Sequence, residues 1–104
     1  MGIGSALHEE MVIDKTGKVR NPSFLDYHLV TSLDVPKMIP IIVECPEPEG
    51  PYGAKGLGEP GLAPTPAAIG NAVADALGVR VYDLPLKPEN VYWAIQNKKK
   101  KDAA

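Results

Sequence analysis

The chain has 104 residues, a formal net charge of −2 and 44% hydrophobic residues, which suits one small globular unit. This charge excludes a general attraction to nucleic acid or to an anionic membrane, and no apolar run approaches the ~20 residues that a membrane span needs. The N-terminus has early acids and no basic region, unlike a signal peptide, and the one cysteine cannot form an internal disulfide. We therefore expect a cytoplasmic protein without membrane or nucleic-acid partners.

The first 44 residues predict one helix and three short extended segments. Residues 2–11 place Ile3, Leu7 and Met11 four residues apart, which is typical of a helix, and no capping residue precedes them, so we expect the end of a longer helix. Residues 12–19 predict a hairpin around an Asp-Lys-Thr-Gly turn. Residues 20–38 have no period and contain prolines. Residues 39–44, "IPIIVE", predict a strand buried on both faces.

Residues 46–66 predict a long ordered loop. They contain six prolines and five glycines, more than half of those two residue types in the chain. A loop of more than ~15 residues is usually functional or disordered. Low charge and the apolar side chains of Tyr52, Leu57 and Leu62 favour order.

The last third predicts helix, strand and helix. Residues 65–78 have Thr65 as N-cap, an apolar stripe every four residues and Gly78 as the closing residue. Residues 79–85 alternate as a strand does, and residues 88–98 begin with Pro88 and Glu89, which suit a helix start. We expect an α+β fold of four short strands and three helices in one partial domain, 1–104, with residues 98–104 as a disordered tail.

The stretch "GAKGLGEPG", residues 53–61, fits the pattern G-x-G-x-x-G but does not predict a phosphate loop. A dinucleotide site needs a strand directly before the first glycine, and the nearest predicted strand ends about eleven residues earlier, near Glu44. Glu59 places a carboxylate where a pyrophosphate would bind, and Pro60 lacks an N–H. A Walker A loop fails as well, because no Gly-Lys-Ser/Thr is present.

Two interpretations of this stretch stay open on spacing alone. Gly53, Gly56, Gly58 and Gly61 allow the backbone to approach a flat or bulky group, with Glu59 offered as a proton acceptor. The alternative is a Pro/Gly turn with a solvated glutamate, which spacing alone favours.

Several ordered motifs resemble the C-terminal end of the molybdenum-binding large subunit of the xanthine dehydrogenase/aldehyde oxidase family, the molybdenum hydroxylases. The motifs are "GIGSALHEE", a "D-x-x-G-x-V-x-N-P" turn, "DY" followed by "DVP", the "GAKGLGEP" loop, the helix ending in "ALG", and "LPLKPE". The resemblance covers roughly residues 2 to 95. It implies that this α+β chain is a C-terminal fragment of a molybdopterin-binding domain.

The resemblance also implies a reaction and a site. Glu59 corresponds to the family's catalytic general base, acting on a metal-bound hydroxide that attacks an aldehyde or N-heterocycle, with hydride transfer completing the oxidation. The residues expected along the molybdenum–pterin cofactor are Gly53, Ala54, Lys55, Gly56, Leu57 and Gly58. Lys55 either offsets charge there or is a solvated lysine. Iron–sulfur clusters and a flavin are expected on other domains or subunits, and no metal ligand on this chain.

The chain departs from the family in length, because family subunits have many hundreds of residues. The segments that hold the pterin and the substrate are missing here, so we expect a larger molybdenum-binding subunit as partner and an inactive isolated chain. The alternative is a non-catalytic structural or interaction subunit, or a truncated remnant, that self-associates to cover its apolar face.

The remaining candidate residues favour ordinary roles. His8 and His28 are interpreted as structural or surface residues, because nothing in the sequence brings them together. Cys45 is interpreted as a small structural residue rather than a nucleophile. Tyr92 and Trp93 are interpreted as packing residues of the last helix.

Overall fold

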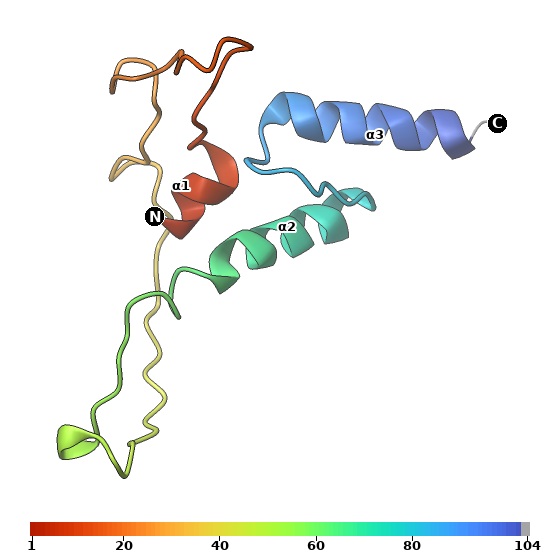
Figure 1. The fold of residues 1–104 in the computed structure, drawn as a ribbon. Coiled ribbons are helices and arrows are strands. Elements are labelled where there is room, and N and C mark those ends of the chain that lie inside the picture. The colour runs from red at the N-terminus through yellow and green to blue at the C-terminus, as the bar shows by residue number, and fades with distance from the viewer. Residues whose placement is uncertain (103–104) are drawn as a thin grey trace.

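The computed structural model describes residues 1–102 and contains four helical segments (Figure 1). They are the α-helix α1 (Gly2–Leu7), the 3-10 turn η1 (Pro51–Gly53), and the α-helices α2 (Pro64–Leu77) and α3 (Pro88–Asp102). Three α-helices were predicted, and three are present. None is long and apolar enough to cross a membrane, among the residues described.

Two of the four predicted strands are absent from the described chain and the other two are reduced to a single bridge, so the α+β description needs correction. Strand pairing in residues 1–102 is limited to one antiparallel bridge, between Ile13 and Val19. Residues 39–44 and 79–85 form no strand. The physical reason is that a strand needs a neighbour to receive its backbone hydrogen bonds, and no other segment of the described chain lies in register beside either one.

The helix α1 ends earlier than predicted. The backbone N–H groups of His8 and Glu9 both donate to the carbonyl of Gly4, at 2.8 Å each, which closes the helix after Leu7. Beyond that point Glu9 accepts a hydrogen bond from the hydroxyl of Tyr27, and Glu10 pairs with Lys87. These contacts draw the chain away from the helix axis.

A small core forms where α1 meets α2 and the segment before α3. Only Ala6, fully buried, and Leu86, 5% exposed, are buried hydrophobic residues in the described part. The N–H of Leu86 donates to the carbonyl of Ala6 at 2.6 Å. A Cβ on Gly2 would lie 2.5 Å from the Cβ of Thr65, so only glycine permits this approach of α1 to α2.

The predicted hairpin at residues 12–19 is confirmed as a turn closed by the single bridge. The N–H of Asp14 donates to the carbonyl of Lys18 at 3.0 Å, and the N–H of Gly17 donates to Asp14 at 3.0 Å. Gly17 has a φ of 82°, which explains why glycine stands there.

The two long helices confirm most of the predicted end signals. Gly78 closes α2 with a φ of 63°, and Pro88 begins α3. The predicted N-cap is wrong, because α2 begins at Pro64 and Thr65 lies inside it. The helix α3 continues through the lysine run to Asp102, where we expected a disordered tail. Its lysines complement the helix dipole, and Lys98 also donates to the carbonyl of Gly78. The rest of the expected tail, residues 103–104, lies outside the described residues.

The molecule is far more extended than a folded domain of its length. Its Cα radius of gyration is 18.4 Å and its extents are 59 × 37 × 28 Å, whereas about 13 Å is expected for a compact chain of this size. Figure 1 shows the cause: residues 38–62, which we call the arm, project from the helices and reverse direction at η1.

Candidate functional site

The predicted glycine loop lies on the returning half of the arm, between η1 and α2 (Figure 1). The reversal is held at its tip by a hydrogen bond from the N–H of Glu47 to the carbonyl of Gly53, at 3.0 Å. Gly53 has a φ of 76° and packs against Pro46, where an added Cβ would approach to 3.1 Å. Both facts require glycine at this position, so Gly53 shapes the turn.

Residues 54–58, with the sequence Ala54, Lys55, Gly56, Leu57 and Gly58, are exposed along their whole length. Leu57 is 83% exposed, which is unusual for leucine in a finished core. The side chain of Leu57 is therefore not packed in a core of the described chain. The loop's one side-chain hydrogen bond runs from Nζ of Lys55 to Sγ of Cys45, at 3.2 Å.

The exposure of Cys45 and its contact with Lys55 do not fit the interpretation of Cys45 as a small structural residue. Cys45 is exposed, and the reversal at η1 brings Lys55 to its sulfur although ten residues separate them in sequence. Sequence reasoning missed this pair. The sequence feature that could have predicted this pair is the turn formed by Pro51 and Gly53. Such a turn places the residues before it beside those that follow it.

Glu59 lies at the point where the loop turns into α2. Its backbone carbonyl accepts from the N–H groups of Leu62, at 2.8 Å, and Ala63, at 3.0 Å. This turn fixes the backbone of Glu59 relative to the helix. The Glu59 side chain is exposed, and its carboxylate has no hydrogen-bond or ion-pair partner within residues 1–102. A fixed backbone carrying an unpaired carboxylate suits a group that must meet something outside this chain.

The glycines around Glu59 leave the backbone open to a large neighbour. A Cβ built on Gly56, Gly58 or Gly61 would meet no atom within 4 Å. A flat or bulky group therefore has room to approach the backbone closely on this side of the loop. The described chain does not supply a set of metal ligands, because residues 1–102 contain no group of three His, Cys, Asp or Glu side chains placed to hold an ion. The loop therefore offers an open backbone and an unpaired carboxylate, without a set of metal ligands in the described chain.

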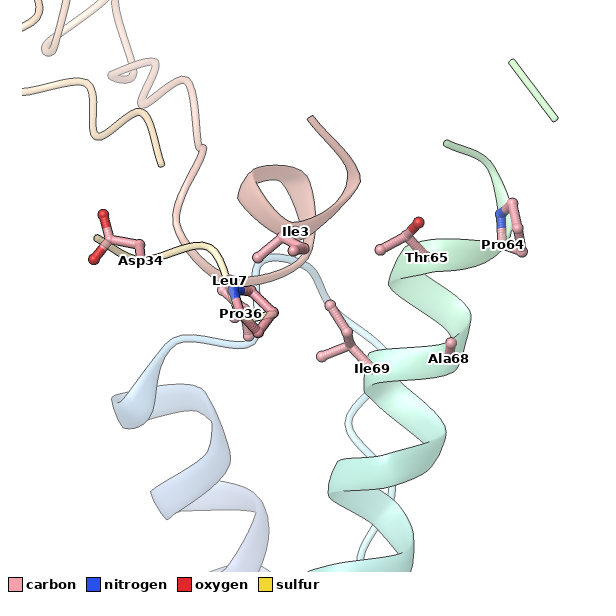
Figure 2. Close-up of a pocket in the computed structure, with 8 residues that line it drawn as sticks. All are labelled: Ile3, Leu7, Asp34, Pro36, Pro64, Thr65, Ala68 and Ile69. Carbon is pink, nitrogen blue, oxygen red and sulfur yellow. The ribbon is translucent and has the colours of Figure 1, made fainter. Parts of the chain in front are cut away.

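A separate apolar pocket of about 600 Å³ lies between α1, α2 and the segment that leads into the arm (Figure 2). Ile3 and Leu7 of α1 and Ile69 of α2 are among the apolar residues that line it. Asp34 is its one charged lining residue. The carboxylate of Asp34 accepts hydrogen bonds from the hydroxyl of Thr31, at 2.6 Å, and from the backbone N–H of Thr31, at 2.8 Å. These bonds hold the pKa of Asp34 below its usual range. The pocket offers apolar packing and no free acid or base.

The other residues weighed from sequence lie at the surface, which was expected for the two histidines and not for Tyr92 and Trp93. His8 and His28 are exposed, and no histidine pair forms in the described chain. Tyr92 and Trp93 make an edge-to-face pair with ring centroids 5.2 Å apart, yet both stay more than half exposed. The packing role predicted for them is therefore only partly realised among residues 1–102.

Comparison with known proteins relates this chain to molybdenum enzymes. A family model described as a molybdopterin cofactor-binding domain matches residues 1–36. A putative xanthine dehydrogenase molybdenum-binding subunit from Escherichia coli is 53% identical over 93 residues, covering 88% of this chain. An aldehyde oxidoreductase molybdenum-binding subunit from Escherichia coli is 41% identical over 88 residues, covering 83% of this chain.

A solved structure shows the same fold. The crystal structure of quinoline 2-oxidoreductase from Pseudomonas putida 86 superposes on 91% of this chain with a TM-score of 0.80 and 35% identity. The match covers 13% of that chain, and this chain spans only 12% of the length of each of the two Escherichia coli subunits.

Proposed function

This chain belongs to the family of xanthine dehydrogenase and aldehyde oxidoreductase molybdenum-binding subunits, and from that premise we propose that it supplies the catalytic-base loop of a molybdenum hydroxylase. The site is completed by a larger molybdenum-binding partner. The observation that carries the proposal is the unpaired carboxylate of Glu59, whose backbone is held in the turn before α2 between glycines that leave the backbone open. The substrate class we propose is an aldehyde or an N-heterocycle.

The loop suits a molybdenum–pterin cofactor as one wall of its site. The open backbone at Gly56 and Gly58 gives a planar pterin room, and the exposed side chain of Leu57 gives it an apolar contact. When bound, the cofactor supplies the two-electron oxidation of the substrate. In our proposal the electrons leave through iron–sulfur clusters and a flavin on other subunits, since this chain has one cysteine.

Glu59 acts in this proposal by accepting a proton at its carboxylate. The turn from Glu59 to Ala63 fixes the backbone that carries this carboxylate relative to α2, and in our proposal the bound cofactor and the partner orient the side chain. Proton transfer by a positioned group typically contributes ~10²–10⁴-fold to a rate. Lys55 lies four residues away, with its ammonium turned to Cys45, and we assign it no proton-transfer step.

The experiment replaces Glu59 by glutamine in the assembled protein, because glutamine keeps the size and removes the base. We expect Glu59→Gln to retain partner and molybdenum content and to lose ~10²–10⁴-fold in kcat. Glu49→Gln is the matched control, because Glu49 is an exposed glutamate in the arm before η1. Equal turnover in the Glu59 and Glu49 variants would contradict the assignment of the base.

A non-catalytic role is the second candidate, and the observation that favours it is the exposure of the arm. Ile42 and Val43 are 87% and 83% exposed, so an isolated remnant would cover them by self-association. The two candidates differ in metal content, since a scaffold or remnant would purify without molybdenum.

A further inference from the structure

The outgoing half of the arm is an apolar segment that is left largely uncovered by residues 1–102. From Met38 to Val43 every residue is hydrophobic or proline, and the large side chains are between 71% and 87% exposed. In an extended chain successive side chains point to opposite faces, so both faces of this segment are apolar. A soluble protein rarely exposes such a segment unless another surface covers it.

The backbone of this segment is also unpaired. No backbone N–H or C=O of residues 35–46 takes part in a backbone hydrogen bond, and Figure 1 shows them as an extended trace beside no strand. Buried backbone groups are almost always hydrogen-bonded. A partner that covers the apolar side chains must therefore also receive the backbone groups, and an adjacent β-strand does both.

The prolines show which edge of the segment pairs. In a strand the N–H and C=O of one residue point to one edge, and those of the next residue to the other. Pro36 and Pro40 lack an N–H and both belong to the even-numbered set. Proline is found at an edge that is not hydrogen-bonded. The pairing edge is therefore the odd-numbered one, formed by Ile39, Ile41 and Val43.

We propose that residues 38–43 are the edge strand of a sheet in the larger molybdenum-binding partner, paired through Ile39, Ile41 and Val43. This inference rests on the proposed function. We choose this partner because of the comparisons. The chain matches 13% of the quinoline 2-oxidoreductase chain and 12% of the Escherichia coli subunit, so most of each relative's length lies outside it. An extended shape of this kind is expected of a segment that folds against that remainder.

The pairing also positions the glycine loop. Residues 38–43 lead directly into Cys45 and Glu47, which are joined to Lys55 and Gly53 on the returning half of the arm. Anchoring the outgoing half on a sheet therefore restrains the returning half, which carries Glu59. The strand acts by positioning and touches no reacting group.

The test uses two proline variants that differ only in register, in tagged full-length chain expressed in its own cells. Ile41→Pro removes an N–H from the pairing edge, and Ile42→Pro removes one from the other edge. We expect Ile41→Pro to capture the molybdenum-binding family chain, identified by mass, at least tenfold more weakly. That loss corresponds to about 1.4 kcal/mol. Ile42→Pro should stay within about twofold of the unmodified chain.

Hydrogen exchange on the unmodified complex gives a second, independent readout. The amides of Ile39, Ile41 and Val43 should exchange slowly in the complex and fast in the free chain, while the amide of Ile42 stays fast in both. If Ile41→Pro loses helix content by circular dichroism, this exchange pattern alone decides the inference.

The outcomes separate the inference from the function on which it rests. Equal capture by both variants, or equal exchange of all four amides, would overturn the edge strand and leave the proposed function standing. Capture of only a second copy of this chain would overturn the assigned partner. Capture of no molybdenum-binding chain by the unmodified protein would overturn both.

Discussion

Asp14 shows how a single turn residue sets a measurable property. Its carboxylate oxygen accepts from the hydroxyl of Thr16 at 2.6 Å, and from the N–H groups of Thr16 and Lys18. These bonds stabilise the charged form, so the pKa of Asp14 lies below its usual range, with the Thr16 hydroxyl as the largest cause.

The sign of the resulting pH dependence follows from that direction. Because the folded pKa is lowered, Asp14 stabilises the hairpin above its unfolded pKa, and this contribution is lost as pH falls through the folded pKa. We predict that Thr16→Val raises the pKa of Asp14 toward its usual value, measured by carbon NMR titration of the carboxyl group. Thr31→Val is the control, because it should raise the pKa of Asp34 alone. An unchanged Asp14 titration in Thr16→Val would contradict this account.

The candidate site was partly predictable from residues. Glycines flanking Glu59 predicted an open loop, and the structure has that loop exposed and unobstructed at Gly56 and Gly58. The role of Glu59 stays a prediction, since spacing alone favours a solvated turn and only the family resemblance implies a base. The contact of Lys55 with Cys45 was not predictable, because it depends on the reversal at η1, which is a property of the folded chain.

At the scale of elements, local signals were enough for helices and not for strands. The C-terminal end of α2 at Gly78 and the start of α3 at Pro88 were predictable because glycine and proline act on neighbouring residues. Residues 39–44 have strand-forming side chains and still form no strand here. A strand depends on backbone partners from another segment, and the described chain contains none for it.

The packing of α1 on α2 gives a prediction with a matched control. Gly2→Ala places a Cβ 2.5 Å from that of Thr65, so it should destabilise the helical part by ~1–3 kcal/mol and lower its melting temperature. Gly70→Ala adds a Cβ in α2 where no atom lies within 4 Å. It should raise the melting temperature, because alanine favours a helix over glycine by ~1 kcal/mol. Thermal circular dichroism at 222 nm measures both. Equal shifts in the two variants would show that α1 does not depend on this close approach.

At the scale of the whole molecule, the exposed arm governs solution behaviour. The chain has two buried hydrophobic residues in its described part and a radius of gyration of 18.4 Å. We predict that the isolated chain self-associates as its concentration rises, measured by sedimentation velocity, because association covers residues 38–43. The double variant Ile41→Lys, Ile42→Lys should remain monomeric at concentrations where the unmodified chain does not. Self-association of equal strength in both would place the contact outside the arm.

The claim that this chain completes a molybdenum enzyme is tested most directly by its metal content in its own cells. The tagged chain is purified, and molybdenum and partner masses are measured in the same peak. We predict molybdenum in equimolar amount, together with a larger chain of the same family. A metal-free chain that purifies alone or with copies of itself would contradict the account, and would leave Glu59 as a solvated glutamate in a loop with nothing to enclose.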